Sequence, residues 1–337
     1  MAEAKTQILY TQGKDSSGSL VFAKDAEKGL DYFCPLCNTE FILRKSGNTG
    51  KGSKRPHFAH KNLTVNCTPE TVLHYLFKTQ AYELIRKHIL QNEALNFNWM
   101  CKYCEEKHSG NLLKKAKNVK LEYNLGSCLP DIALFDENDK VYAVIEVVVT
   151  HAPEESTLKF YKENKIILIK LNIVNESQLE NVNEKLTYPD FVDFCINPRC
   201  KKCGDYLLKK RMIIIEAKCY RCEKDIKIAG IDSQNDGVIR KINSHLTPSD
   251  FNEMEIDFAR SKKVNLVLNF SKTAGMKYLA NSCKECKAFM GDFHSFEEYY
   301  APAEYGDLKS QKYDIGFVCR NCPEVDIFKI EKDGDNK

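Results

Sequence analysis

The stretch Ala143-Val144-Ile145-Glu146-Val147-Val148-Val149-Thr150-His151 places a single carboxylate inside an apolar run, which predicts a buried β-strand with an acid at its centre. A second acid, Asp131, lies at the start of the preceding apolar run Pro130-Asp131-Ile132-Ala133-Leu134. An ionised carboxylate in apolar surroundings is unfavourable without a partner, and two that approach each other repel unless a cation bridges them. Oxygen ligands suit Mg²⁺ or Mn²⁺, so Asp131 and Glu146 are predicted to hold a divalent metal ion.

The residues around these two acids predict an α/β fold. An apolar pattern of helical period from Glu70 to about Leu90 predicts an amphipathic helix, with Thr68 and Pro69 as its start signals. The cluster Asp136-Glu137-Asn138-Asp139 predicts a turn, so the strands on either side of it should form a hairpin. The other predicted elements are strands at 119–123, 129–135, 141–149 and 166–169 and a helix that includes 158–161.

The helix that begins at Glu70 carries three polar residues at intervals of four, namely Glu70, His74 and Lys78. At about 100° per residue, these side chains overlap the sector of the apolar face. They are therefore predicted either to form an ion-pair ladder on the surface or to line a cleft.

Length and composition limit the class of protein. A chain of 337 residues with 43% hydrophobic content predicts two or three folded domains, and a net charge of +3 provides no global positive field. The sequence contains neither a signal peptide nor an apolar stretch of membrane-spanning length, which predicts a cytoplasmic protein without a membrane partner. Twelve of its fifteen cysteines form Cys-x-x-Cys pairs, which is typical of metal knuckles in a reducing compartment.

Two sets of paired knuckles predict zinc ribbons near the C-terminus, because four thiolates can close a tetrahedral zinc site. The first set is Cys200, Cys203, Cys219 and Cys222. The second set is Cys283, Cys286, Cys319 and Cys322, with His294 as a competing ligand. Basic residues would give the first ribbon a surface that favours phosphates. They are Arg199, Lys201, Lys202, Lys209, Lys210 and Arg211.

The N-terminal knuckle predicts a zinc site of two cysteines and two histidines. Its expected ligands are Cys34, Cys37, His57 and His60, with Phe58 packed beneath them.

A fourth zinc ion is a further possibility at the knuckle Cys101-Lys102-Tyr103-Cys104, for which a redox role is the alternative. His108, Cys67 and Cys128 are its candidate completing ligands, whereas Cys195 is predicted to be a buried apolar cysteine.

These zinc ions are predicted to be structural, because a catalytic zinc usually keeps an open position and three of these sets supply four protein ligands. Such ions fold small modules that lack large cores. The expected organisation is an N-terminal β-rich zinc module at 1–65, an α/β core at 66–175, a zinc ribbon at 195–235 and a second ribbon-containing module at 236–330.

Pro130-Asp131 followed by Glu146-Val147-Val148 resembles the motif of the PD-(D/E)XK nuclease superfamily. With the N-terminal cysteines and histidines and the Glu70, His74 and Lys78 series, residues 30 to 175 are similar to the competence protein CoiA-like nucleases. This resemblance implies a mixed sheet flanked by helices and a Mg²⁺- or Mn²⁺-dependent endonuclease that cuts nucleic acid, with DNA as the expected substrate. It implies that Asp131 and Glu146 bind the metal and that Glu70 is an accessory acid.

The sequence departs from the superfamily motif at one position, because Val148 replaces the usual lysine. Lys78 is the best-placed substitute, with His74, Lys159 and His151 behind it. Two alternative functions follow from this departure. The chain could bind nucleic acid through an inactive nuclease-like core, or the zinc ribbons could dock a protein partner.

Overall fold

The apolar run around Glu146 forms β10 (Val141–Val148), the central strand of a five-stranded sheet with the order β12-β11-β10-β9-β8. β10 pairs parallel with β11 (Ile167–Asn172) and antiparallel with β9 (Ile132–Phe135). A turn from Asp136 to Lys140 joins β9 to β10, which confirms the predicted hairpin. The edge strands are β8 (Asn118–Leu121) and β12 (Phe191–Val192).

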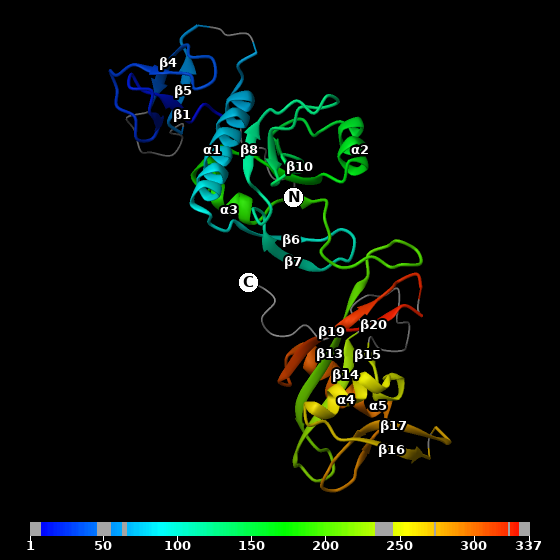
Figure 1. The fold of residues 1–337 in the computed structure, drawn as a ribbon. Coiled ribbons are helices and arrows are strands. Elements are labelled where there is room, and N and C mark those ends of the chain that lie inside the picture. The colour runs from blue at the N-terminus through cyan, green and yellow to red at the C-terminus, as the bar shows by residue number, and fades with distance from the viewer. Residues whose placement is uncertain are drawn as a thin grey trace. The chain divides into compact units, whose positions relative to one another are not determined.

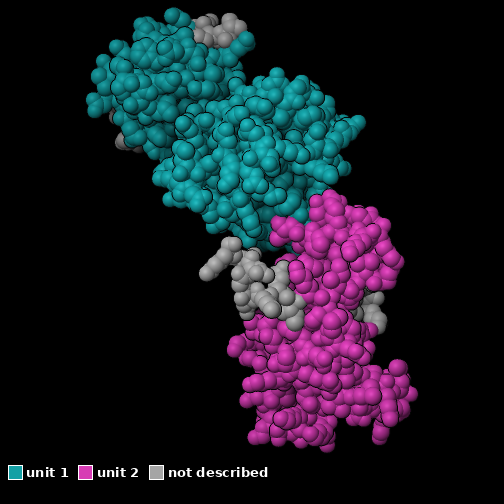
Figure 2. All heavy atoms as spheres, viewed as in Figure 1, with its two compact units in different colours: residues 1–195 teal, residues 196–337 magenta. Residues whose placement is uncertain are grey.

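The computed structural model describes residues 8–45, 55–62, 66–232, 245–272, 274–322 and 324–329. The chain divides into two units, residues 1–195 and 196–337 (Figure 2). Both units combine sheets with helices, so the predicted α/β class is confirmed, while the assignment of a PD-(D/E)XK core stays a prediction. Within the described ranges, none of the helices has the length and apolar character that crossing a membrane requires.

Helix α1 (Pro69–Gln91) lies on one side of the central sheet and α2 (Glu155–Glu163) on the other (Figure 1). The Thr68 side chain accepts a hydrogen bond from the Thr71 amide, which satisfies one of the free N–H groups in the first turn. Asn92 ends α1 in a left-handed conformation, with φ of 53°. The predicted start and end of this helix are therefore confirmed.

The N-terminal part of unit 1 is a five-stranded antiparallel sheet around an aromatic core. Phe58 is fully buried, and its ring stacks on Phe41 with centroids 5.4 Å apart. The strands, in the order β2-β1-β3-β4-β5, are β1 (Gln12–Lys14), β2 (Leu20–Phe22), β3 (Tyr32–Phe33), β4 (Glu40–Arg44) and β5 (His57–His60).

Smaller elements complete unit 1 (Figure 1). The strands β6 (Asn96–Met100) and β7 (Lys107–Asn111) form a two-stranded hairpin around the Cys101 knuckle. The helices η1 (Glu176–Glu180) and α3 (Val182–Thr187) follow β11.

Unit 2 is built on the long strand β13 (Leu208–Lys218), which pairs with β14 (Asp225–Asp232) on one side and β19 (Ser310–Val318) on the other. Alternate residues of β13 enter two different cores, as strand geometry requires. Met212 and Ile214 pack with Phe258 of α4 (Glu253–Ser261). Ile213 and Ile215 pack with Tyr299 and Tyr300.

The remaining elements of unit 2 surround this sheet. Strands β15 (His245–Leu246) and β20 (Asp326–Phe328) are its edges, and the three-stranded sheet comprises β16 (Leu266–Ser271), β17 (Met276–Ser282) and β18 (Phe289–Met290). The short helices are η2 (Pro248–Asp250), α5 (Asp292–Ser295), η3 (Phe296–Tyr300) and α6 (Ala301–Tyr305). The five-stranded sheet therefore combines strands from both modules expected at 195–235 and 236–330.

Candidate functional site

The two predicted carboxylates lie side by side where β9 meets β10. Ile132 pairs with Ile145, so Asp131 and Glu146 are the next residues along the two strands. The Asp131 carboxylate accepts a hydrogen bond from the amide of Val147 at 2.9 Å, and the Asp131 amide in turn bonds the Glu146 side chain. Backbone groups of the central sheet therefore fix both acids.

Helix α1 supplies the positive side of this site. The Lys78 ammonium lies 3.2 Å from Oδ1 of Asp131 and 2.6 Å from Oε1 of Glu122, although the Lys78 side chain is only 8% exposed. His74, one turn earlier, places Nε2 3.1 Å from Oδ2 of Asp131. His74 and Lys78 therefore both contact Asp131 of the central sheet, while the prediction that they line a cleft stays a prediction.

Glu146 is buried and held by α2. Its Oε1 accepts a hydrogen bond of 2.5 Å from the hydroxyl of Tyr161, which is itself 1% exposed. Burial raises the pKa of Glu146 to about 7, and the negative charge of Asp131 adds to this increase, while the bond from Tyr161 opposes it. In the absence of a cation, Glu146 therefore lowers the stability of the fold as the pH rises from its ordinary pKa of 4.5 to about 7, and this loss is complete above that pH.

Asp131 has the opposite tendency. Burial favours its neutral form, but the contacts with His74, the Val147 amide and Lys78 outweigh burial and hold the pKa of Asp131 below its usual range. Burial likewise opposes the charge of Lys78, but the contacts with Glu122 and Asp131 raise its pKa above the ordinary value. The site therefore combines an ionised aspartate, a charged lysine and a glutamate that takes up or releases a proton near neutral pH.

The other predicted catalytic residues lie elsewhere. Glu70, in the first turn of α1, interacts with Tyr10 of the N-terminal sheet, and within the described ranges no hydrogen bond or ion pair links Glu70 to Asp131. Lys159 is 74% exposed and pairs with Glu163, while exposed His151 contacts Thr150. Lys78 is therefore the lysine that takes the position near the acids.

Metal donors in groups of three or more occur at four places in the part of the chain that the structure describes, and all four are cysteine clusters. The pair of Asp131 and Glu146 is not among them, and Lys78 and His74 contact Asp131. A divalent ion at the acidic pair would therefore have two carboxylates from the protein and take its other ligands from water or a bound phosphate.

Each of the four cysteine clusters could hold one zinc ion. The Sγ atoms of Cys34 and Cys67 are 3.6 Å apart, those of Cys104 and Cys195 3.7 Å, and those of Cys222 and Cys283 3.7 Å. Zinc–sulfur bonds at tetrahedral angles separate two sulfurs by about 3.8 Å, whereas a disulfide would bring them to about 2.05 Å. The spacing therefore fits zinc coordination.

The knuckles share one backbone geometry. In five of them the residue after the second cysteine has a positive φ, and its amide bonds the carbonyl of the first cysteine. This turn points both thiols of a pair toward the same site. The five residues are Asn38, Glu105, Gly204, Glu223 and Lys287.

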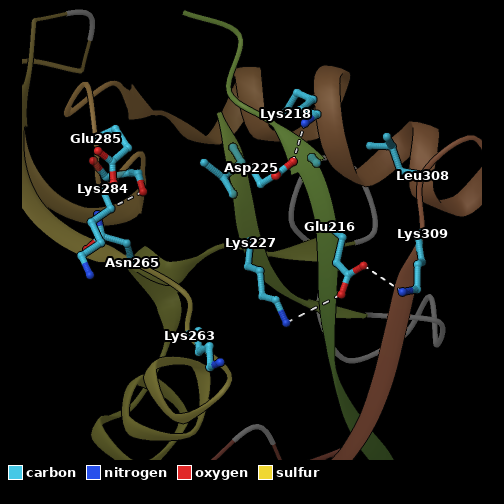
Figure 3. Close-up of a pocket in the computed structure, with 13 residues that line it drawn as sticks. Glu216, Lys218, Asp225, Lys227, Lys263, Asn265, Lys284, Glu285, Leu308 and Lys309 are labelled. Atoms are coloured by element: carbon cyan, nitrogen blue, oxygen red, sulfur yellow. Dashed lines mark hydrogen bonds and ion pairs between the residues drawn. The ribbon is translucent and has the colours of Figure 1, made fainter. Parts of the chain in front are cut away.

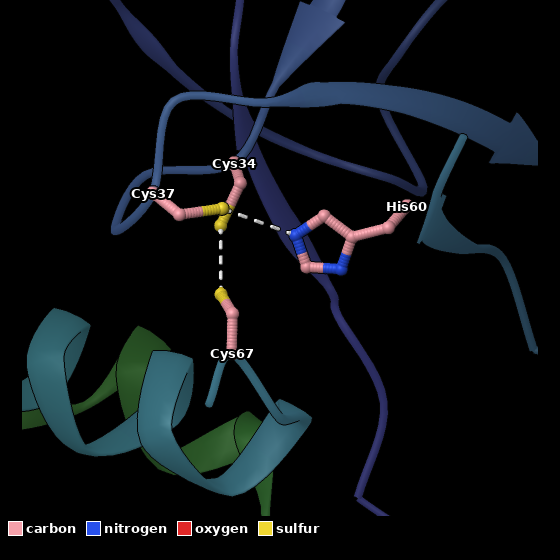
Figure 4. Close-up of side chains that lie close together, drawn as sticks. All are labelled: Cys34, Cys37, His60 and Cys67. Carbon is pink, nitrogen blue, oxygen red and sulfur yellow. Dashed lines mark hydrogen bonds between the residues drawn. The ribbon is translucent and has the colours of Figure 1, made fainter. Parts of the chain in front are cut away.

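The N-terminal cluster consists of Cys34, Cys37, His60 and Cys67 (Figure 4). The prediction that His57 is the fourth ligand is wrong, because His57 and His60 are three residues apart on β5 and therefore face opposite sides of the strand. His57 instead contacts the carbonyl of Arg55 through Nδ1. Cys67 directly precedes the N-cap of α1, so this cluster connects the N-terminal sheet to the helix that carries His74 and Lys78.

The second cluster consists of Cys101, Cys104, His108 and Cys195, all buried. Of the candidate completing ligands, His108 is confirmed as a member, whereas Cys67 and Cys128 lie elsewhere. The prediction that Cys195 is a simple apolar residue is wrong, since its thiol bonds Cys104 at 3.7 Å and lies 3.5 Å from His108 Nε2. The hydrogen bond from Cys195, together with His108, lowers the pKa of Cys104 to about 4.

The C-terminal knuckles combine differently from the predicted ribbons. Cys200 and Cys203 join Cys319 and Cys322, while Cys219 and Cys222 join Cys283 and Cys286. The strand β13 explains why, because its 11 residues lie between the first two knuckles. An extended strand of that length spans about 35 Å, which is far more than one zinc site can bridge. Antiparallel β19 then brings Cys319 to the Leu208 end of β13. His294 is in neither cluster and packs against Tyr220.

Four of the six residues of the expected basic surface around the first C-terminal knuckle form ion pairs. Lys210 is buried and pairs with Glu255 and Asp326, while Lys209 and Arg211 both pair with Asp314. Lys202 pairs with Glu324. These residues hold the sheet and α4 together, so that of the six expected basic residues Arg199 and Lys201 form no ion pair with a described residue.

The interleaved pairing predicts a specific pattern of thiol protection. Replacing Cys319 by serine should open the cluster to which it belongs, so that Cys200, Cys203 and Cys322 react with iodoacetamide. The other C-terminal cluster should stay protected, because Cys319 is not one of its members, which are Cys219, Cys222, Cys283 and Cys286. Mass spectrometry of the alkylated peptides identifies which cysteines have reacted. Reaction at Cys283 and Cys286, with Cys200 and Cys203 protected, would instead support sequential ribbons.

No family model, curated protein or solved structure matches this chain.

Proposed function

We propose that unit 1 is a metal-dependent nuclease that hydrolyses phosphodiester bonds, with DNA as the expected substrate. The observation that supports this most directly is the position of Lys78. Val148 lies two residues after Glu146, where the superfamily has lysine. The Lys78 ammonium, supplied from α1, lies 3.2 Å from the Asp131 carboxylate. A cation is thus present beside Asp131 although the usual position lacks one.

In this proposal, Asp131 and Glu146 hold the Mg²⁺ or Mn²⁺ ion. When bound, this ion would polarise the phosphodiester and lower the pKa of a water molecule. Their carboxylate oxygens suit such an ion, because Mg²⁺ and Mn²⁺ are both hard cations that prefer oxygen ligands.

The protein groups around the acids would each have a separate task. Lys78 would stabilise the negative charge that develops on the phosphate oxygens, as a fixed cation in a buried site does efficiently. His74 holds the Asp131 carboxylate through a bond of 3.1 Å, and Tyr161 holds Glu146. Both contacts would keep the carboxylates oriented without touching the substrate.

The four cysteine clusters would hold structural zinc. Each supplies four protein ligands, which leaves no open position for a catalytic water. An inactive core that only binds nucleic acid is the competing function.

Cleavage assays separate these two functions. Labelled DNA and RNA, single- and double-stranded, would be incubated with the full chain and Mg²⁺ or Mn²⁺. We expect metal-dependent cutting that falls at least about a hundredfold in Asp131→Asn and Glu146→Gln, because each removes a metal ligand. Unchanged zinc content and melting temperature would show that both variants are folded. If a wild-type chain with full zinc content cuts none of the substrates, the nuclease proposal fails and the binding function takes its place.

A further inference from the structure

Unit 2 contains a cleft of about 690 Å³ beside the zinc cluster of Cys219, Cys222, Cys283 and Cys286. This volume lies within the range of roughly 300–1,000 Å³ that ligand sites occupy. One wall comes from the adjoining ends of β13 and β14, and the other from the end of α4 and the Cys283 knuckle. The zinc cluster joins these two walls, since each contributes one knuckle to it.

Lysine dominates the lining of this cleft, which includes five lysines and three acids. Figure 3 shows Lys263 and Lys284 on one side, and the group of Glu216 and Lys309 on the other. The remaining charged residues of the lining are Lys218, Asp225, Lys227 and Glu285.

The acids do not neutralise these lysines. Glu216 is shared by two of them, at 2.9 Å from Lys309 and 3.7 Å from Lys227, and Asp225 pairs with Lys218. Lys263 and Lys284 form no ion pair with any described residue. Positive charge therefore remains in the cleft, where it attracts anions.

The arrangement of the lysines points to an extended anion. Lys309 is 82% exposed and Lys218 68% exposed, so charge continues past the rim onto the surface. A site for a small free phosphate would converge buried donors on one point, whereas spaced ammonium groups suit a backbone with many phosphates.

We propose that this cleft binds consecutive phosphate groups of a nucleic-acid strand and so holds the substrate for unit 1, an inference that rests on the proposed nuclease function. Zinc at the adjacent cluster would position the cleft, because Lys218 precedes Cys219 and Lys284 lies between Cys283 and Cys286.

Lys263 offers a variant that separates binding from folding. It follows the C-cap of α4 with φ of 69°, a left-handed conformation that glycine adopts without steric strain. Lys263→Gly should therefore fold at least as well as the wild type. Combined with Lys284→Gln, it removes both lysines of the cleft lining that form no ion pair with a described residue. The matched control is Lys272→Gln with Lys277→Gln, which removes two exposed lysines of the same unit that lie outside the cleft.

Fluorescence anisotropy with a labelled single strand would test the proposal on the full chain carrying Asp131→Asn, so that cutting cannot interfere. At about 100 mM salt, we expect the Lys263→Gly/Lys284→Gln protein to bind at least about fivefold more weakly than the control. The slope of log Kd against log salt should fall by about 1.4, which corresponds to two lost phosphate contacts. Equal affinities and equal slopes for the cleft variant and the control would overturn the proposal.

Competition distinguishes a strand from a free nucleotide. Unlabelled strand should displace the probe at its own Kd, whereas ATP at the same phosphate concentration should be much weaker because it offers fewer contacts. Displacement by ATP as effective as by the strand would overturn the assignment to a strand.

The two functions can fail independently. If the chain cuts nothing but the cleft variant loses binding, the cleft stands and the nuclease proposal falls. If the chain cuts and the cleft variant binds like its control, the cleft falls and the nuclease stands.

Discussion

Replacing Cys195 by serine should lower the zinc content of the purified chain from four ions to three, whereas Cys128→Ser should leave it at four. Cys195 belongs to the buried cluster with Cys101, Cys104 and His108, and Cys128 is the one cysteine outside the four clusters. A serine hydroxyl is a poor zinc ligand compared with a thiolate. Elemental analysis of both variants after gel filtration gives the count.

The same substitution should destabilise the β6–β7 hairpin. Zinc binding by four ligands contributes folding free energy on the order of 10 kcal/mol in small modules, and losing one ligand removes a large part of it. The hairpin is also held by Trp99, which donates to the carbonyl of Phe194 next to Cys195, and by Lys102, which pairs with Asp193. Rapid amide exchange across 96–111 in Cys195→Ser, but not in Cys128→Ser, is the expected result. Retention of four zinc ions by Cys195→Ser would show that Cys195 is no ligand.

The sequence predicts the central sheet well because its signals are local. An apolar run, a turn cluster of acids and an N-cap each act within a few residues, and β10, the β9–β10 hairpin and α1 lie where these signals place them. The pair of Asp131 and Glu146 follows from the same hairpin, since its register brings the two acids together.

The ligand sets of the zinc clusters depend on longer-range geometry. Cys195 lies 87 residues after His108, and nothing near Cys195 in the sequence indicates a partner. Cys67 lacks a Cys-x-x-Cys partner in the same way. The alternation of side chains along β5 could have excluded His57 as a ligand of the N-terminal cluster. The length of the apolar run in β13 could have excluded a zinc ribbon formed by the two knuckles on either side of it. What the sequence could not indicate is the return of β19 along β13.

The contact between Lys78 and Asp131 also could not be predicted from the sequence. Their spacing in the sequence places Glu70, His74 and Lys78 along one side of α1, but it does not determine the position of α1 along the sheet. In the fold, β8 and β10 contact α1, and it is His74 and Lys78 that reach Asp131. Glu70 lies toward the N-terminal sheet instead.

Replacing Lys78 by methionine should lower metal-dependent cleavage by about 10²- to 10³-fold, the usual effect of removing one fixed group that stabilises transition-state charge. Methionine retains much of the length of the side chain, so the packing of α1 against the sheet should survive. Because Lys78 helps to lower the pKa of Asp131, its loss should also move the acidic limb of the pH–rate profile to higher pH. Single-turnover cleavage across a pH series measures both effects.

Lys159→Met is the matched control, since Lys159 was a candidate for the same role but is exposed on α2 and pairs only with Glu163 among the described residues. It should cut at the wild-type rate. Lys78→Arg keeps the charge near Asp131 and should recover part of the lost activity, which a purely structural role of Lys78 would not explain. Removing a buried lysine also leaves Asp131 without one of its partners, so melting curves must show that Lys78→Met is folded. A folded Lys78→Met protein that cuts like the wild type would mean that Lys78 only neutralises Asp131 and Glu122, and that the transition state is stabilised by another group.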